Sequence, residues 1–523
     1  MKKTSKIIVS LLAILAIAIF QFCATSPYPA EVENALKKAG DNRAELEKVI
    51  HHYQETGDSL KLQAAYFLIG NMDGHSFIRY ELLDTSGAAV DFDVLSYPDY
   101  KTMVAAWDSV SDAIGGMDWQ RKETLEDLQH ITANFLIENI DYGFRAWHEK
   151  PWADYLTFSD FCEYVLPYRG SNEPLESWRP YFFKKHQDLA KRMSDPKDPI
   201  EATSLINDDL KTWFTFDPIF YRHPQDQALS EMLQNKKGRC EDMTNLAIYA
   251  MRANGLAVTS DYTPHWADTG NNHAWNALLD RSGKVIMFMG DEANPGTYHL
   301  HNRMAKVYRK TYSLQRNNLV FQKPEWEKVP RWLSGKNYAD VTRDYVDVSD
   351  VTVTLTEPVP DSVNYAYLCV FNDGEWKAIH WGKIEGEKVT FTDMGRNIAY
   401  LPMYFVHGKL IPAASALILE KDGTIRPLVA DENDKIKIKL VSTTRRKQLA
   451  DTDGIEKAFF KTGKAYQLFY WNDEWISAGE MIADGHPLIF SEIPNHGLYW
   501  LVEKDSRREE RIFTIEDGKQ VWW

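Results

Sequence analysis

Three short stretches decide the fold: residues 238–242 read Gly-Arg-Cys-Glu-Asp, residues 273–276 read His-Ala-Trp-Asn, and residues 290–292 read Gly-Asp-Glu. Together they supply a thiol, an imidazole and a carboxylate in the order that a Cys-His-Asp nucleophilic site needs. In such a site the thiol attacks, the imidazole accepts its proton, and the carboxylate holds the imidazole in one tautomer. We therefore expect the three stretches to meet in space.

The thiol is expected to lie at the start of a helix. Apolar residues follow Cys240 at helical spacing, namely Met243, Leu246, Ala247, Ala250 and Met251. Asn254-Gly255 then supplies the stop. A cysteine in the first turn lies beside the positive end of the helix dipole and unpaired backbone N–H groups. These groups favour the thiolate and can hold an oxyanion, so one feature would serve both tasks.

Strands are expected to carry the other two side chains. Residues 256–262 alternate apolar and polar, and residues 273–279 and 284–289 are expected to form a hairpin. For a hairpin loop of two, three or four residues, the residue opposite His273 is respectively Glu292, Asp291 or Gly290. A carboxylate therefore faces or adjoins the imidazole in every register.

These stretches resemble the core of the transglutaminase-like superfamily. The resemblance covers about residues 200–312 and rests on Gly-Arg-Cys-Glu-Asp-Met-Thr-Asn-Leu, Arg-Ala-Asn-Gly-Leu-Ala-Val, His-Ala-Trp-Asn and Gly-Asp. It implies a papain-like fold in which a cysteine at a helix start faces histidine and aspartate on adjacent strands. It also implies that Cys240 is the nucleophile, His273 the base and Asp291 the orienting acid.

Two departures from the family pattern leave alternatives open. The third motif of the family often reads Asp-Pro-Thr, whereas residues 291–295 read Asp-Glu-Ala-Asn-Pro, so Glu292 is an alternative to Asp291. His265 is a second imidazole close by in the sequence. The strand start at His273 fits the motif better than the loop position of His265.

Composition bounds the remaining possibilities. The chain has 523 residues, too many for one core, and a net charge of −15 from 60 basic and 75 acidic residues. An acidic chain without a Lys/Arg run argues against nucleic acid as a partner. No Cys-x-x-Cys pair occurs and His299-x-His301 has no third ligand nearby, so we expect neither a metal nor a cofactor. Cys162 and Cys369 are expected to be buried thiols rather than a disulfide.

The N-terminus has the pattern of an export signal. Three lysines precede an apolar run over residues 7–20, which is short for a membrane-spanning helix. Cys23 follows directly and resembles the acylated cysteine of a bacterial lipoprotein, although Phe22 replaces the usual small residue. We expect a lipid-anchored protein of the cell envelope, in the periplasm or at the outer-membrane surface, attached to the membrane only through this N-terminus. Cleavage near Ser26 or an uncleaved anchor are the alternatives.

A multidomain α+β architecture is expected. Its parts are an export signal (1–23), a helical N-terminal domain (24–195), a papain-like transglutaminase core (196–335) and two C-terminal β-sandwich units (336–440 and 441–523). The last two follow from short strands separated by Asn/Asp/Gly turns.

The two β units are expected to be tandem copies. Residues 368–376 read Leu-Cys-Val-Phe-Asn-Asp-Gly-Glu-Trp, and residues 468–475 read Leu-Phe-Tyr-Trp-Asn-Asp-Glu-Trp. A Phe-bearing strand and an aromatic strand follow each copy, at offsets of 99 to 100 residues. Aromatic side chains on such units could stack on glycans, but strand aromatics more often fill a core.

The function expected from these features is that of an exported cysteine enzyme. It would act on the peptide or carboxamide bonds of a peptide or protein substrate through an acyl-thioester, with hydrolysis favoured over crosslinking because water needs no second binding site. The alternative is a catalytically silent surface protein that binds glycans or proteins through its β-sandwich units.

Overall fold

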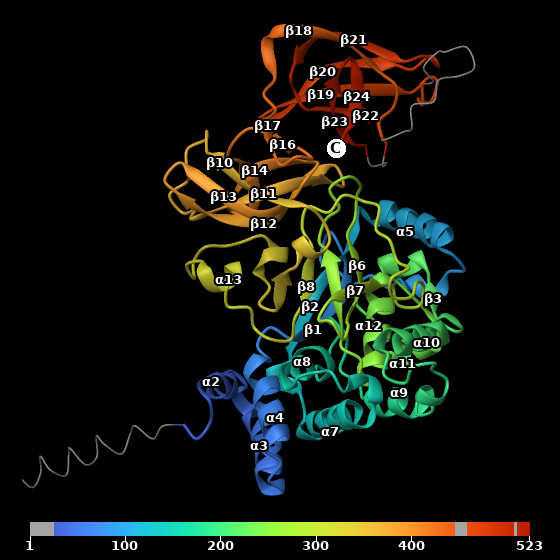
Figure 1. The fold of residues 1–523 in the computed structure, drawn as a ribbon. Coiled ribbons are helices and arrows are strands. Elements are labelled where there is room, and N and C mark those ends of the chain that lie inside the picture. The colour runs from blue at the N-terminus through green and yellow to red at the C-terminus, as the bar shows by residue number, and fades with distance from the viewer. Residues whose placement is uncertain (1–25, 445–457, 507–509) are drawn as a thin grey trace, which may run out of the picture. The chain divides into compact units, whose positions relative to one another are not determined.

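The computed structural model describes residues 26–444, 458–506 and 510–523 (Figure 1). The export signal expected over residues 1–23, with Cys23, lies outside these ranges. Within them, no helix has the length and apolar character needed to cross a membrane. Two compact units are present: the described residues up to Ser76 with Leu125–Asp141, and Phe77–Thr124 with Tyr142–Trp523.

The first unit is helical. It contains α2 (Ala30–Lys38), α3 (Arg43–Thr56), α4 (Ser59–Asn71) and α6 (Asp127–His130), and α7 (Ala133–Glu149) begins in it. On α3 one face carries apolar residues at helical spacing and is buried, namely Leu46, Val49, Ile50 and Tyr53. Asp58 caps α4 by accepting the backbone N–H of Lys61 at 3.0 Å. Spacing and caps therefore determine this unit.

The second unit opens with two strands that the sequence did not predict. β1 (Ser76–Asp84) pairs with β2 (Met117–Glu126), and α5 (Tyr100–Ile114) lies between them in the chain. Most of β2 is polar and exposed or half-buried, so it lacks the apolar alternation that indicates a strand. Short helices α8 (Phe158–Asp160) and α9 (Arg179–Lys185) lead into the core.

The core packs helices against an antiparallel sheet of order β7-β6-β5-β8-β9. Its helices are α10 (Pro199–Lys211), α11 (Leu229–Asn235) and α12 (Cys240–Arg252), and α13 (Leu319–Gln322) follows. Its strands are β5 (Val258–Thr263), β6 (His273–Leu279), β7 (Val285–Phe288), β8 (Tyr308–Lys310) and β9 (Tyr338–Asp340). A short parallel pair, β3 (Thr215–Phe216) with β4 (Lys237–Gly238), leads directly into α12. The predicted strands are confirmed with shifts of one or two residues at their ends.

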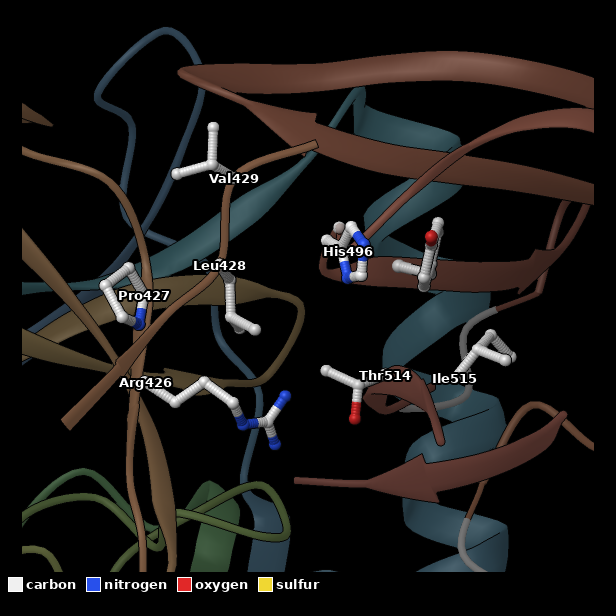
Figure 2. Close-up of a pocket in the computed structure, with 9 residues that line it drawn as sticks. Arg426, Pro427, Leu428, Val429, His496, Thr514 and Ile515 are labelled. Carbon is white, nitrogen blue, oxygen red and sulfur yellow. The ribbon is translucent and has the colours of Figure 1, made fainter. Parts of the chain in front are cut away.

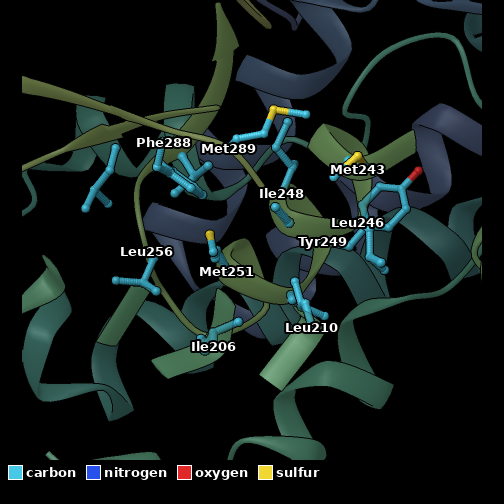
Figure 3. Packing of buried hydrophobic residues seen from close by; sticks show 14 of the residues in the cluster. Ile206, Leu210, Met243, Leu246, Ile248, Tyr249, Met251, Leu256, Phe288 and Met289 are labelled. Carbon is cyan, nitrogen blue, oxygen red and sulfur yellow. The ribbon is translucent and has the colours of Figure 1, made fainter. Parts of the chain in front are cut away.

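Apolar side chains fix α12 against α10 and the sheet. Figure 3 shows Ile206 and Leu210 from α10 next to residues of α12, with Phe288 and Met289 farther away in the same apolar cluster. All four of these residues are buried. Since burying one such side chain contributes roughly 1.5–3 kcal/mol, this cluster holds the first turn of α12 in place over β6.

The C-terminal half consists of two β-rich units, shown orange to red in Figure 1. The first β unit has the strand order β10-β13-β12-β11-β14-β16-β17, with β15 beside β14. These strands are β10 (Val348–Thr354), β11 (Tyr365–Asn372), β12 (Glu375–Glu385), β13 (Lys388–Gly395), β14 (Ile398–Val406), β15 (Lys409–Pro412), β16 (Leu417–Leu419) and β17 (Ile425–Pro427).

The second β unit repeats this pairing. It has a sheet of order β20-β19-β22-β23-β24 and a separate pair, β18 with β21. Its strands are β18 (Asp431–Leu440), β19 (Ala465–Asn472), β20 (Glu474–Ile482), β21 (Leu488–Asn495), β22 (Tyr499–Glu503), β23 (Ile512–Glu516) and β24 (Lys519–Trp522).

Strand pairing confirms the predicted repeat. In the first β unit β11 pairs with β12 and β14, and in the second β19 pairs with β20 and β22. Both long hairpins carry a register shift at the equivalent point, after Leu368 and after Leu468. The two copies therefore share a bulge at the same place in the hairpin as well as the strand order.

Aromatic side chains of the two copies pack on one another. Ring centroids lie 5.0–5.9 Å apart in a cluster formed by Phe371, Trp376, Trp471, Trp475 and Trp500. Offset and edge-to-face contacts at such distances stabilise a core. The rings that the sequence offered as platforms for a glycan therefore form the contact between the two β units.

Candidate functional site

Cys240 is the first residue of α12, as predicted, and its side chain is buried. The helix start is capped by Asp242, whose carboxylate accepts the backbone N–H of Arg239 at 2.9 Å and that of Gln227 at 2.8 Å. Arg239 in turn bonds Asp226 at 2.6 Å. Backbone and side-chain bonds thus fix the residue that precedes the thiol.

The immediate surroundings of the sulfur contain one acid and one backbone donor. The thiol of Cys240 donates to Glu241 Oε2 at 3.0 Å, and the backbone N–H of Ala274 lowers the pKa of the thiol. This effect indicates that the sulfur lies close to the residue that follows His273. The structure thereby brings the predicted nucleophile to the start of β6.

The thiol is not activated in this arrangement. Burial and then the charge of Glu241 raise the pKa of Cys240 well above its ordinary value, while the Ala274 N–H and Arg239 lower it. The expectation that the helix start favours a thiolate is therefore not met. Loss of solvation and a neighbouring carboxylate both disfavour the negative sulfur directly.

His273 begins β6, opposite Thr263 on β5. Its Nε2 lies 2.6 Å from the hydroxyl oxygen of Tyr298, with which it forms a hydrogen bond. The imidazole ring lies against Trp266 at 6.0 Å and Trp275 at 5.9 Å between centroids. Burial lowers the pKa of His273, and the charge of Glu241 opposes this shift. Burial between aromatic rings thus favours the neutral imidazole.

Asp291 follows β7 in a tight turn. Leu279 pairs with Val285 and Asn276 with Phe288, which is the register of a three-residue hairpin loop. This pairing ends at Phe288, and residues 289–293 form a turn closed by the Met289–Ala293 bridge, so the strands do not set Asp291 opposite His273. Asp291 itself has a left-handed backbone (φ 61°), a conformation that costs energy for a residue with a side chain.

Asn207 of α10 holds the Asp291 turn from both sides. Its Oδ1 accepts the backbone N–H of Asp291 at 2.8 Å. Its Nδ2 donates to the carbonyl oxygens of Met289 and Ala293, each at 3.2 Å. Three bonds from one buried amide therefore fix the backbone that carries the acid.

The carboxylate of Asp291 is buried, and neither oxygen has a hydrogen-bond partner among the described residues. Burial raises the pKa of Asp291 well above its usual range, and Lys211 opposes the shift. A buried carboxyl group without partners costs stability, so its retention needs a reason other than packing. Among described residues, hydrogen bonds from Cys240 to His273 and from His273 to Asp291 are not formed.

Glu292 and His265, the two alternative site residues named from the sequence, lie in different surroundings. Glu292 is exposed and its charge acts on Tyr298, whose pKa it raises together with burial. The ring of His265 meets Trp332 edge-on at 6.1 Å, and burial lowers the pKa of His265 to about 4. Neither residue has a recorded contact with Cys240 in the described part of the chain.

Sequence reasoning missed three residues of this site. Glu241 directly follows Cys240 in the sequence, so its proximity to the thiol could have been predicted. Tyr298 and Asn207 belong to no motif, because their roles depend on how a loop and α10 approach the hairpin. Only the tertiary structure identifies them.

A pocket of about 230 Å³ lies elsewhere, between the two β units (Figure 2). Arg426, Leu428, His496 and Ile515 are among the residues that line it. Arg426 is already paired with Glu420 at 2.6 Å and Glu516 at 2.7 Å. The positive charge there is thus neutralised within the protein.

Comparisons with known proteins agree with the geometry of the core. Residues 187–286 match the family model of the transglutaminase-like superfamily, which confirms the resemblance seen in the sequence. The matched segment contains Cys240 and His273 and ends before Asp291. No curated protein matches the chain.

A solved structure also matches. It is the crystal structure of a candidate cysteine protease from Cytophaga hutchinsonii, 15% identical, with a TM-score of 0.17. The match covers 32% of this chain and 64% of that chain. The assignment of a transglutaminase-like core rests on the family match and on the placement of α12, β6 and β7.

Proposed function

We propose that the chain is a cysteine enzyme that acts on peptide or carboxamide bonds through an acyl-thioester, with hydrolysis as the outcome. One observation carries the proposal: within a segment that matches the transglutaminase-like family, Cys240 begins a buried helix, and the backbone N–H of Ala274, next to His273, lowers the pKa of the Cys240 thiol. Cys240 is the nucleophile, His273 the base, and Asp291 the acid that orients His273.

The reaction begins with proton transfer. His273 leaves Tyr298 and takes the thiol proton, and the sulfur attacks the substrate carbonyl to form a tetrahedral oxyanion beside the start of α12. The attack forms the carbon–sulfur bond; collapse of the oxyanion restores the carbonyl and breaks the carbon–nitrogen bond, and the amine departs with the proton from His273. Water then attacks the thioester, loses a proton to His273, and the carboxylic acid and the thiol are released.

The substrate class and location follow the same proposal. A peptide or protein of the cell envelope is the substrate, and the chain reaches it as an exported protein anchored by lipid at Cys23. The acidic character of the chain supports partners other than nucleic acid.

Turnover in ¹⁸O-labelled water, with and without an added primary amine, tests the proposal on the full chain. Peptides of mixed sequence are incubated and their products measured by mass spectrometry, so that ¹⁸O in a new carboxyl group reports hydrolysis and amine incorporation reports crosslinking. Cys240→Ser should lower turnover by at least about 10³-fold, because the nucleophile is lost.

Cys369→Ser is the matched control, because Cys369 is also buried and lies in the first β unit. It should keep wild-type turnover. Equal turnover by wild type and Cys240→Ser would exclude the thiol as nucleophile. Amine incorporation in preference to ¹⁸O would replace hydrolysis by crosslinking.

A further inference from the structure

The loop of residues 264–272 joins β5 to β6 and forms one wall around His273. Trp266 of this loop is buried, and its ring lies nearly parallel to the imidazole, with 27° between the planes. Its backbone N–H donates to the carbonyl oxygen of Asn271 at 3.2 Å, which closes the loop on itself. The position of Trp266, and hence the environment of His273, depends on how this loop is held.

The first β unit holds the loop through the turn between β11 and β12. The side-chain amide of Asn372 donates to three loop carbonyl oxygens, at 2.9–3.0 Å, those of Trp266, Thr269 and Asn271. The next residue, Asp373, accepts the backbone N–H of Asn271 at 3.3 Å. Asn372 is 1% exposed, so water does not compete for these bonds.

The second β unit adds one more contact to the same loop. Arg511 donates to the carbonyl oxygens of Ala267 at 2.6 Å and Phe371 at 2.8 Å. It therefore ties the loop, the strand β11 and the second β unit together. The loop beside His273 is fixed by the C-terminal half of the chain.

The internal repeat supplies a comparison within the molecule. Asn472 occupies the position in the second β unit that Asn372 occupies in the first, at the end of the equivalent strand. Asp473 and Asp373, the residues that follow, both have left-handed backbones (φ 59° and 51°). Asn472 is exposed. The same turn therefore occurs twice, and one copy contacts the core.

We propose that Asn372 is a positioning residue for His273: it fixes the loop of residues 264–272 whose Trp266 lies against the imidazole. The proposal rests on the function proposed above, in which His273 is the base. The first β unit then belongs to the catalytic apparatus.

The groups that face His273 determine what its titration reports. They are Glu241 from α12 and Tyr298 from the segment after β7. Burial lowers the pKa of the imidazole, so admission of water should raise that pKa toward its ordinary value. Loosening the loop is the change that admits water.

The test is the titration of His273 by NMR of the full chain labelled with ¹³C at histidine Cε1, with the resonance assigned through His273→Gln. In Asn372→Ala the pKa of His273 should rise, and Asn472→Ala should leave it at the wild-type value. Asn372→Ser, which keeps one donor, should give a smaller rise. Thermal unfolding of each variant identifies any that fails to fold, and Asn372→Ser then carries the comparison.

A wild-type titration of His273 in folded Asn372→Ala or Asn372→Ser would overturn the proposal, as would an equal shift in Asn472→Ala. The readout needs no turnover, so the result stands even if the chain proves to have no cysteine-enzyme activity. Failure of the proposed function and failure of the positioning role are therefore distinguishable.

Discussion

Cys240 and Cys369 are both buried thiols, but the regions around them bury different groups. Cys240 adjoins Glu241, the Ala274 N–H and the strand start at His273. Cys369 lies on β11 in an apolar cluster, and its sulfur lies 4.0 Å from the carbonyl oxygen of Tyr367. Burial raises the pKa of both thiols.

The comparison shows that a raised thiol pKa does not separate a structural cysteine from a nucleophile at rest. The distinction lies in the polar groups buried nearby. Cys369 packs in a cluster of buried apolar side chains. The core that contains Cys240 also buries a carboxyl group without partners among the described residues, Asp291, on a strained backbone. Such an arrangement lowers stability and is typical of functional sites.

Asp291→Asn has the largest expected effect on turnover, and it tests whether Asp291 is a functional group or a turn residue. If Asp291 orients His273, the amide should reduce turnover by about 10²- to 10⁴-fold, because it no longer stabilises the imidazolium. If Asp291 is only a turn residue, turnover should stay unchanged. Because a buried carboxyl without partners costs stability, thermal unfolding above neutral pH should occur at a higher temperature in either case.

Asp473→Asn is the matched control for this experiment. Asp473 has the same left-handed backbone but is exposed, in the second β unit. Its substitution should change neither turnover nor the unfolding temperature by more than experimental error. Steady-state kinetics and calorimetry on both variants therefore separate the loss of the acid from the loss of a turn residue.

A feature of the fold or the site could be predicted where residues close in the sequence determine it, and could not where residues distant in the sequence do. Cys240, His273 and the repeated β strands follow from local spacing, so helix, hairpin and repeat were predicted close to their observed bounds. The neutral thiol was not predicted, because the effect of Glu241 depends on how much water reaches the sulfur. Asn207 and Asn372 escaped prediction because each acts on a loop that is far away in the sequence.

A second, smaller effect would sharpen the comparison. Glu241→Gln removes the charge that raises the pKa of Cys240, so that pKa should fall, and thiolate at neutral pH should increase. A fall of one unit gives about tenfold faster alkylation by iodoacetamide wherever the pH lies below the pKa. The rate against pH, measured by mass spectrometry for each cysteine peptide, checks this. Cys369 should react at its wild-type rate in the same sample, and an unchanged rate at Cys240 would exclude Glu241 as the cause.

The last expected effect concerns stability against pH. Burial raises the pKa of Asp242, which caps α12, to about 7, against an ordinary value near 4 in the unfolded chain. Between these values the unfolded chain releases a proton that the folded chain keeps. The contribution of Asp242 is therefore most favourable below about pH 4 and is lost as the pH rises to about 7, by roughly 1 kcal/mol per pH unit.

Hydrogen exchange of α12 and β11 peptides at pH 5 and pH 7, corrected for chemical exchange rates, measures this difference by region. In Asp242→Asn the opening free energy of α12 should depend less steeply on pH than in the wild type, although the variant loses one acceptor of the cap. Subtracting wild type from variant removes the opposing effect of the buried histidines, whose pKa values are lowered. Because β11 buries Cys369 among apolar side chains, its peptides should show no such difference. An equal change in both peptides would mean that α12 and β11 open together. The different surroundings of the two thiols would then not produce different local opening free energies.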